Sequence, residues 1–215
     1  LIAGTIMRFQ SKTEGKEAEL ICHDSLILKA HTKIEGGSFG AVSTPALCKT
    51  IDREFSAKSK EDAMEYVAKS MERCWWIWLE GRYSEMFGPR GAFGSDEKTK
   101  CFVCSTLHYE DGPSFNKLDF IGELGKLNSK YGVGSSILSY VQENGYVEVI
   151  DETYDSENIY GVVFASNIEE SGWKNTFGRS LDFYPPYNQN GLWLISMNKF
   201  EETQPCYYQP GISGN

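Results

Sequence analysis

Two cysteines, Cys101 and Cys104, stand three residues apart, a spacing shared by redox and zinc-binding motifs. A redox pair needs its first cysteine at a helix N-terminus, which lowers the thiol pKa. Here Phe102 and Val103 separate the cysteines, and the flanking residues favour a strand. An offset of three on a strand directs the two thiols to opposite faces, so we expect no bond between Cys101 and Cys104. A zinc site would also need a second ligand pair at similar spacing, and the sequence has none.

The chain has six cysteines, an even number, spread over nearly its whole length. Dispersed, even-numbered cysteines are typical of cross-links in an oxidising compartment, and six buried free thiols are the alternative. We predict that most are disulfide-bonded, although the sequence does not choose among the pairings. The disulfide candidates are Cys22, Cys48, Cys74, Cys101, Cys104 and Cys206.

Histidines and carboxylates elsewhere do not form a recognisable catalytic motif. The sequence contains no His-Glu-x-x-His motif. Residues 151–157 carry four carboxylates that suit Ca²⁺, but they lack the order of an EF-hand loop, so a solvated acidic turn is the simpler interpretation. We therefore predict no catalytic residues, no metal site and no cofactor, and we expect a protein that is not an enzyme.

Three tryptophans, Trp75, Trp76 and Trp78, directly follow Cys74. Successive residues of a helix point about 100° apart, so the three rings cannot all face one core. Trp78 lies four residues from Cys74 and joins its apolar stripe. Either a second element covers the far side, or Trp75 and Trp76 contribute to an interaction surface.

The first seven residues are uncharged and precede Arg8. This segment is too short to cross a bilayer, which takes roughly 20 apolar residues. It is either the outer end of a transmembrane helix or a strand that pairs with a neighbouring subunit. We expect lipid or another subunit to bury its anchor or assembly residues, which are Leu1, Ile2, Ile6 and Met7.

The clearest predicted element is a helix over 59–80. Ser59 with Asp62 resembles a capping box, and Gly81 is a plausible C-terminal stop. Apolar residues recur at steps of three and four, which predicts a buried face. The residues expected on that face are Ala63, Val67, Met71, Cys74 and Trp78.

Further helices and strands follow from periodicity and turn residues. We predict helices over 11–31, 114–128 and 135–143. In the helix over 114–128, one face is expected to carry Leu118, Ile121 and Leu124. Strands are expected over 101–109, 146–150, 159–166 and 192–197. Helices dominate the first half and strands the second, which favours an α+β fold with N-terminal helices packed on a mainly antiparallel sheet from the C-terminal half. We expect an apolar segment with a stalk-like helix at 1–31 and a single extracytoplasmic domain at 32–215.

Composition limits the classes of partner. The 215 residues are 40% hydrophobic and carry a net charge of −9. Such a chain folds into a globular core, and its acidic surface disfavours nucleic acid, because phosphates would be repelled.

Several short runs are similar to a group of exported proteins: Glu19-Leu-Ile-Cys22-His-Asp-Ser25-Leu-Ile-Leu28, Ala46-Leu-Cys48-Lys-Thr50, Ala68-x-x-Met71-x-Arg73-Cys74-Trp75, Glu80-Gly81 and Cys101-x-x-Cys104. They resemble uncharacterised archaeal proteins with one N-terminal transmembrane helix followed by an exported domain that contains cysteines. The resemblance spans about Arg8 to Ile150. It implies membrane tethering, an archaeal origin and paired cysteines, and it carries no catalytic residues.

Together these features favour a non-enzymatic cell-surface structural or interaction subunit. It would be membrane-tethered, or it would assemble into an extracellular filament by self-association. The alternative is an exported binding module for carbohydrate or a small ligand. A concave pocket lined by aromatic rings and convergent polar groups would favour the alternative, and a buried carboxylate pair in a cleft would favour an enzyme.

Overall fold

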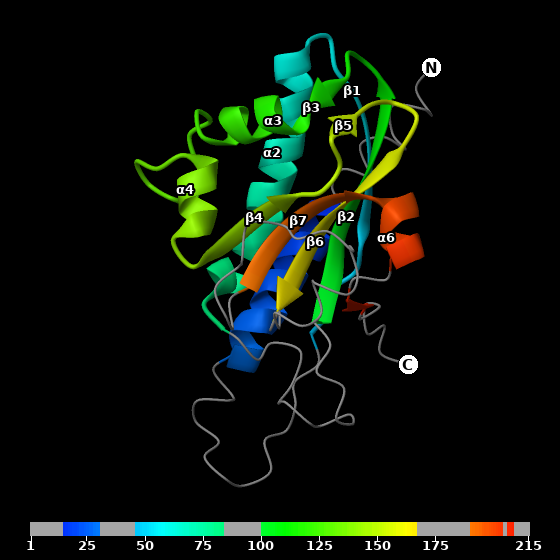
Figure 1. Cartoon of the computed structure of the whole chain (residues 1–215). Helices are drawn as coiled ribbons and strands as arrows, with labels where there is room; N and C mark the ends of the chain where they lie inside the picture. The colour runs from blue at the N-terminus through cyan, green and yellow to red at the C-terminus, as the bar shows by residue number, and fades with distance from the viewer. Residues whose placement is uncertain (1–14, 31–45, 84–99, 167–189, 204–205, 209–215) are drawn as a thin grey trace, which may run out of the picture.

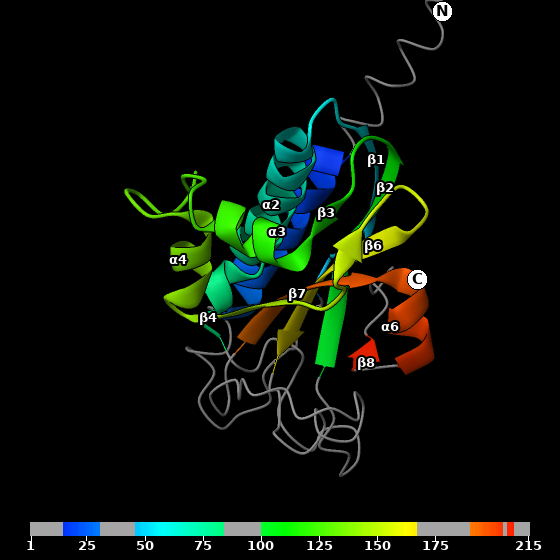
Figure 2. The same cartoon turned by 45° about the horizontal axis from the view of Figure 1, so that its top comes forward.

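A computed structural model of the chain describes residues 15–30, 46–83, 100–166, 190–203 and 206–208. In these ranges, helices cover one face of a twisted sheet, and a shorter helix lies against the other face (Figures 1 and 2). The predictions for Leu1, Ile2, Ile6 and Met7 lie outside the described residues.

Helix α2 (Lys60–Ile77) forms where its local signals predict. The side chain of Ser59 accepts the backbone N–H of Asp62 at 3.1 Å and so caps the helix. Glu61 and Asp62 lie in the first turn, where the positive end of the helix favours carboxylates. The predicted core face is confirmed, since these side chains are all buried: Ala63, Val67, Met71, Cys74 and Trp78.

The sheet has the strand order β1-β2-β6-β7-β4, and β8 also pairs with β2. Its two central pairs are antiparallel, and the pairs that involve β1, β4 and β8 are parallel. The strands are β1 (Ile51–Ser56), β2 (Lys100–Asp111), β4 (Gly145–Val149), β6 (Ile159–Ser166), β7 (Asn190–Ser196) and β8 (Tyr207–Tyr208). The predicted α+β class is confirmed, with β1 as a strand that the sequence did not indicate.

Smaller elements complete the fold. A second sheet pairs β3 (Phe115–Asn116) with β5 (Thr153–Tyr154). Helix α4 (Ile137–Gln142) confirms the predicted helix near 135–143, and α6 (Met197–Thr203) follows β7 directly. A 3₁₀ turn, η1 (Leu79–Gly81), follows α2.

Helix α3 (Lys117–Leu124) differs from its prediction at both ends. It begins after Asn116, whose side chain accepts the N–H of Asp119 at 2.8 Å, because Phe115 and Asn116 are held in β3. The helix therefore turns Phe120 and Leu124 into the core and leaves Leu118 80% exposed. The prediction that Leu118 shares a face with Ile121 and Leu124 is wrong, because Leu118 is exposed while Leu124 is buried.

Strand β2 shows how its two cysteines separate. The register with β6 passes from Val103 directly to Ser105, so Cys104 lies at a bulge. Cys104 joins the core under the helices, and Cys101 joins a second cluster on the opposite face of the sheet. Phe200 of α6 belongs to that second cluster.

The N-terminal helix, described over 15–30, lies beside α2 (Figure 2). Its Cys22 and Leu26 belong to the same hydrophobic core as α2. The prediction of a stalk-like helix separate from the domain is therefore wrong, because this helix has partners in the domain's own core. Among the described residues, no helix combines the length and apolarity needed to cross a membrane.

Candidate functional site

Three disulfides fix the elements around the site. They join Cys22 to Cys48, Cys74 to Cys104, and Cys101 to Cys206. The prediction that Cys101 and Cys104 bond separately is confirmed. Three disulfides indicate an oxidising, extracytoplasmic environment.

One face of the N-terminal helix exposes large apolar side chains, with the exposed carboxylates of Glu17 and Asp24 among them. Leu47 lies beside this face, because its backbone N–H donates to the Ser25 hydroxyl at 3.0 Å. Ser25 is one helical turn from Ile21 and one turn from Leu28. Four side chains are about half exposed here: Leu20 at 53%, Ile21 at 53%, Leu28 at 54% and Leu47 at 49%. We call these four residues the outer apolar face.

The opposite face of the helix is held in place by charge as well as by packing. The buried Glu19 carboxylate pairs with the Arg53 guanidinium, and its second oxygen lies 3.4 Å from Nη1 of Arg73. A carboxylate this buried is stable only with such partners. The ion pairs and the Cys22–Cys48 disulfide together prevent the helix from rotating, so Leu20, Ile21 and Leu28 stay directed outward.

Trp76 joins the two helices through a stack of rings. Its indole lies 3.9 Å from the His23 ring and 5.1 Å from the Tyr131 ring, both nearly parallel to it. Buried Glu72 holds the loop that carries Tyr131, because its carboxylate accepts the Ser129 hydroxyl at 2.7 Å and the Tyr131 N–H at 3.4 Å.

Trp75 does not belong to an interaction surface, and that prediction is wrong. The side chain is fully buried and packs against Phe164, with ring centroids 5.9 Å apart. Its indole lies over two glycines: a Cβ added at Gly81 or Gly145 would come within 2.3 Å of the ring. Trp76 is partly buried and packs against the core, so only its uncovered part is available for contact.

A pocket of about 280 Å³ opens where the N-terminal helix meets the end of α2. The residues that line it are His23, Ile27, Ala30, Trp76, Leu79, Glu80, Arg82 and Tyr83. Two lining residues and the glycine after them have positive φ angles, which are 54° at Leu79, 58° at Glu80 and 68° at Gly81. For leucine and glutamate this conformation is strained, and such strain often occurs where a structure holds a ligand.

Polar side chains hold this strained turn. The amide of Asn190 donates to the carbonyl oxygens of Gly81 and Tyr83. The Tyr140 hydroxyl donates to Oε1 of Glu80 at 3.1 Å, and Arg82 pairs with Oε2. Burial raises the pKa of Tyr140, and the nearby Glu80 carboxylate raises it further. The Tyr140 hydroxyl therefore remains a donor at neutral pH.

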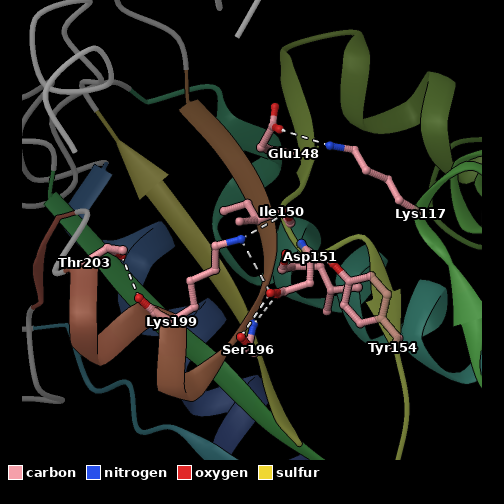
Figure 3. A network of polar contacts seen from close by, with 9 residues as sticks. Lys117, Glu148, Ile150, Asp151, Tyr154, Ser196, Lys199 and Thr203 are labelled. Carbon is pink, nitrogen blue, oxygen red and sulfur yellow. Dashed lines mark hydrogen bonds and ion pairs between the residues drawn. The ribbon is translucent and has the colours of Figure 1, made fainter. Parts of the chain in front are cut away.

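The acidic stretch at 151–157 serves the fold. Figure 3 shows Asp151 at the start of α6. Its carboxylate accepts hydrogen bonds from the backbone N–H of Ser196 at 2.6 Å and from the Ser196 hydroxyl at 3.1 Å. The Lys199 ammonium lies 3.6 Å away. Asp155 accepts the N–H of Glu157 at 3.1 Å within its own turn. In the described part of the chain, no three His, Cys, Asp or Glu side chains group as metal ligands.

Glu148, also shown in Figure 3, is a partly buried carboxylate with the Lys117 ammonium 3.9 Å from it. Burial raises the pKa of Glu148, and the Lys117 ammonium lowers it by a smaller amount. The pair sits at the junction of β4 and α3.

No known protein family, curated protein or solved structure matches this chain. The site therefore has to be interpreted from its own geometry.

Sequence reasoning found part of this region. It identified Trp76 and predicted the helix over 11–31, but it did not single out Arg82 or Tyr83. A helix with apolar residues on nearly every side was the available signal, because one helix rarely buries all sides in a single small domain.

Proposed function

We propose that this chain is the extracytoplasmic domain of a cell-surface interaction subunit that works by contact and not by catalysis. The contact is with further copies of itself, through the outer apolar face. One observation carries the proposal: Leu20, Ile21 and Leu28 are each more than half exposed on a helix whose other side is cross-linked into the core. Water-exposed aliphatic clusters are typical of association surfaces.

The size of the face supports a weak, repeated contact. Four half-exposed side chains offer on the order of a few hundred Å², which is the size of a functional patch on a typical monomer. A stable dimer buries about 800 Å² on each partner. Contacts below that size become effective when many copies are held close together, as on a membrane or along a filament.

The net charge disfavours anionic lipid and also opposes a second copy, so a contact between copies depends on the charges beside the face. The net charge of −9 repels anionic head groups, which disfavours laying this helix on a membrane. The exposed polar residues around the face carry both signs, with Lys16, Glu17 and Asp24 among them. A surface with both signs can complement itself across a two-fold axis.

The three disulfides support export, and the resemblance to tethered archaeal proteins supports attachment to a membrane. Anchoring or strand exchange by Leu1, Ile2, Ile6 and Met7 remains part of the proposal, as does assembly into a filament. The apolar N-terminal residues and the outer apolar face would then act together to bring copies into contact.

Sedimentation velocity over a range of concentrations tests the contact. We expect the full chain to show reversible association that increases with concentration, and the double variant Ile21→Glu with Leu28→Glu to sediment as a monomer. Leu118→Glu is the matched control, because Leu118 is a more exposed leucine on α3, outside the face. Equal association of the double variant and the parent would refute the proposal.

A further inference from the structure

The proposed self-association does not account for the pocket at the end of α2. We infer that it binds a small apolar α-amino acid in its zwitterionic form. The inference stands on the juxtaposition, in one pocket lining, of aliphatic side chains with one carboxylate and one guanidinium. It does not depend on the contact between copies proposed above.

The aliphatic part of the lining suits a short hydrocarbon side chain. Ile27, Ala30 and Leu79 supply aliphatic surface, and Trp76 supplies a flat ring edge. The stacked rings of His23 and Tyr131 fix the indole, so the wall is rigid before a ligand arrives. Rigid apolar walls lower the entropic cost of binding.

The same lining carries a complementary pair of charges. Arg82 is 62% exposed and contacts Glu80 with only part of its guanidinium, so other N–H donors remain available for a carboxylate. Such fork-shaped pairing with a carboxylate is among the strongest polar contacts that proteins make. The Glu80 carboxylate can accept from an ammonium while it keeps the Tyr140 hydroxyl.

A zwitterion fits this pair better than either single charge. An isolated anion would leave Glu80 beside a like charge, and an isolated cation would leave Arg82 beside one. An α-amino acid presents both charges on one carbon atom and places its apolar side chain against the aliphatic part of the lining. The volume of 280 Å³ falls just below the range of about 300–1,000 Å³ for drug-sized ligands, which indicates a small molecule.

The strained turn fixes the two charged groups. Leu79 and Glu80 reach the pocket from left-handed conformations, and the Asn190 amide holds the carbonyls on either side of Arg82. Glycine is required at position 81, between Glu80 and Arg82, because any side chain there would meet the Trp75 ring. Strain kept by long-range contacts is typical of preorganised ligand sites.

Isothermal titration of the full, disulfide-bonded chain with free leucine tests the inference. We expect saturable binding with a dissociation constant on the order of 1 mM or tighter. Isocaproate, which lacks the ammonium, and isoamylamine, which lacks the carboxylate, should each bind at least about tenfold more weakly. Glucose should not bind.

Two variants locate the binding in this pocket. Arg82→Gln and Glu80→Gln should each weaken leucine binding about tenfold or more. Lys69→Gln is the matched control, because Lys69 is also 62% exposed and pairs with a glutamate on the same helix, two turns or more from the pocket. If Glu80→Gln disturbs folding through the lost contact with Tyr140, thermal melting will show it, and the exposed Arg82→Gln then decides.

The inference is overturned by an absence of saturable leucine binding, by equal binding of isocaproate, or by glucose binding in place of leucine. It is also overturned if Arg82→Gln binds leucine as well as Lys69→Gln does. The double variant Ile21→Glu with Leu28→Glu should bind leucine normally, which separates this inference from the proposed self-association.

Discussion

The two faces of the N-terminal helix both carry large apolar side chains, yet only one of them is buried. On the inner face, Cys22 and Leu26 are buried in the common core, and Glu19 pairs with arginines of β1 and α2. On the outer face, Leu20, Ile21 and Leu28 remain about half exposed. The contrast shows that hydrophobicity alone does not determine which face of a helix is buried in its own domain. The partners that cover the buried face come from distant parts of the chain.

Truncating one leucine on each face should give the largest difference. Leu26 is fully buried, so Leu26→Ala should lower the free energy of unfolding by about 2–5 kcal/mol. Leu28→Ala removes the same atoms from an exposed position and should change it by about 0.5 kcal/mol or less. Urea denaturation of dilute samples measures both. Equal losses in the two variants would mean that the faces are wrongly assigned.

Removing the Cys22–Cys48 disulfide should sharpen the comparison further. The bond closes a segment with a sequence separation of 26, and its loss should cost about 3–4 kcal/mol by the loop-closure relation. Hydrogen exchange should rise over 15–30 in the Cys22→Ala, Cys48→Ala variant. The Cys101→Ala, Cys206→Ala variant is the control, since that bond lies on the other side of the sheet. If both variants loosen the helix equally, the disulfide does not hold the inner face.

A buried carboxylate, Glu19, and a partly buried one, Glu148, should have smaller effects on stability, and the two effects should have opposite signs. Glu19 contacts two guanidinium groups, whereas Glu148 has the Lys117 ammonium at 3.9 Å. Because burial raises the folded-state pKa of Glu148, its contribution to stability is present below its unfolded pKa and is lost as pH rises through the folded pKa.

Glu148→Gln should therefore raise the thermal midpoint modestly at neutral pH, and the gain should vanish as the pH falls below the ordinary glutamate pKa. Glu19→Gln should lower the midpoint at neutral pH, since it leaves the partly buried charges of Arg53 and Arg73 without their carboxylate partner. Thermal melts across a pH series check both. A gain for Glu148→Gln that persists in acid would show that charge is not its cause.

The sequence predicted the elements whose causes are local. Ser59 caps α2 and its apolar residues recur at helical spacing, so both the helix and its buried face followed from one segment. The opposite directions of Cys101 and Cys104 followed from strand geometry, even though the bulge at Cys104 was not foreseen.

What the sequence missed depends on partners far along the chain. α3 starts late because Phe115 pairs with Tyr154, and no local signal reports that pairing. Trp75 is buried because Gly81 and Gly145 leave room for its ring, and these glycines come from separate elements. The pocket likewise combines the N-terminal helix with the turn after α2, so its residues converge only in the folded chain.

Photo-cross-linking from the outer apolar face tests the central claim most directly. A benzophenone amino acid placed at position 28 should, on irradiation of concentrated full chain, join two copies through peptides from residues 16–29 of the second copy. The same probe at position 118 of α3 should yield far fewer joined copies. Cross-links from position 28 that are confined to one copy, or dimers formed equally from position 118, would contradict the account.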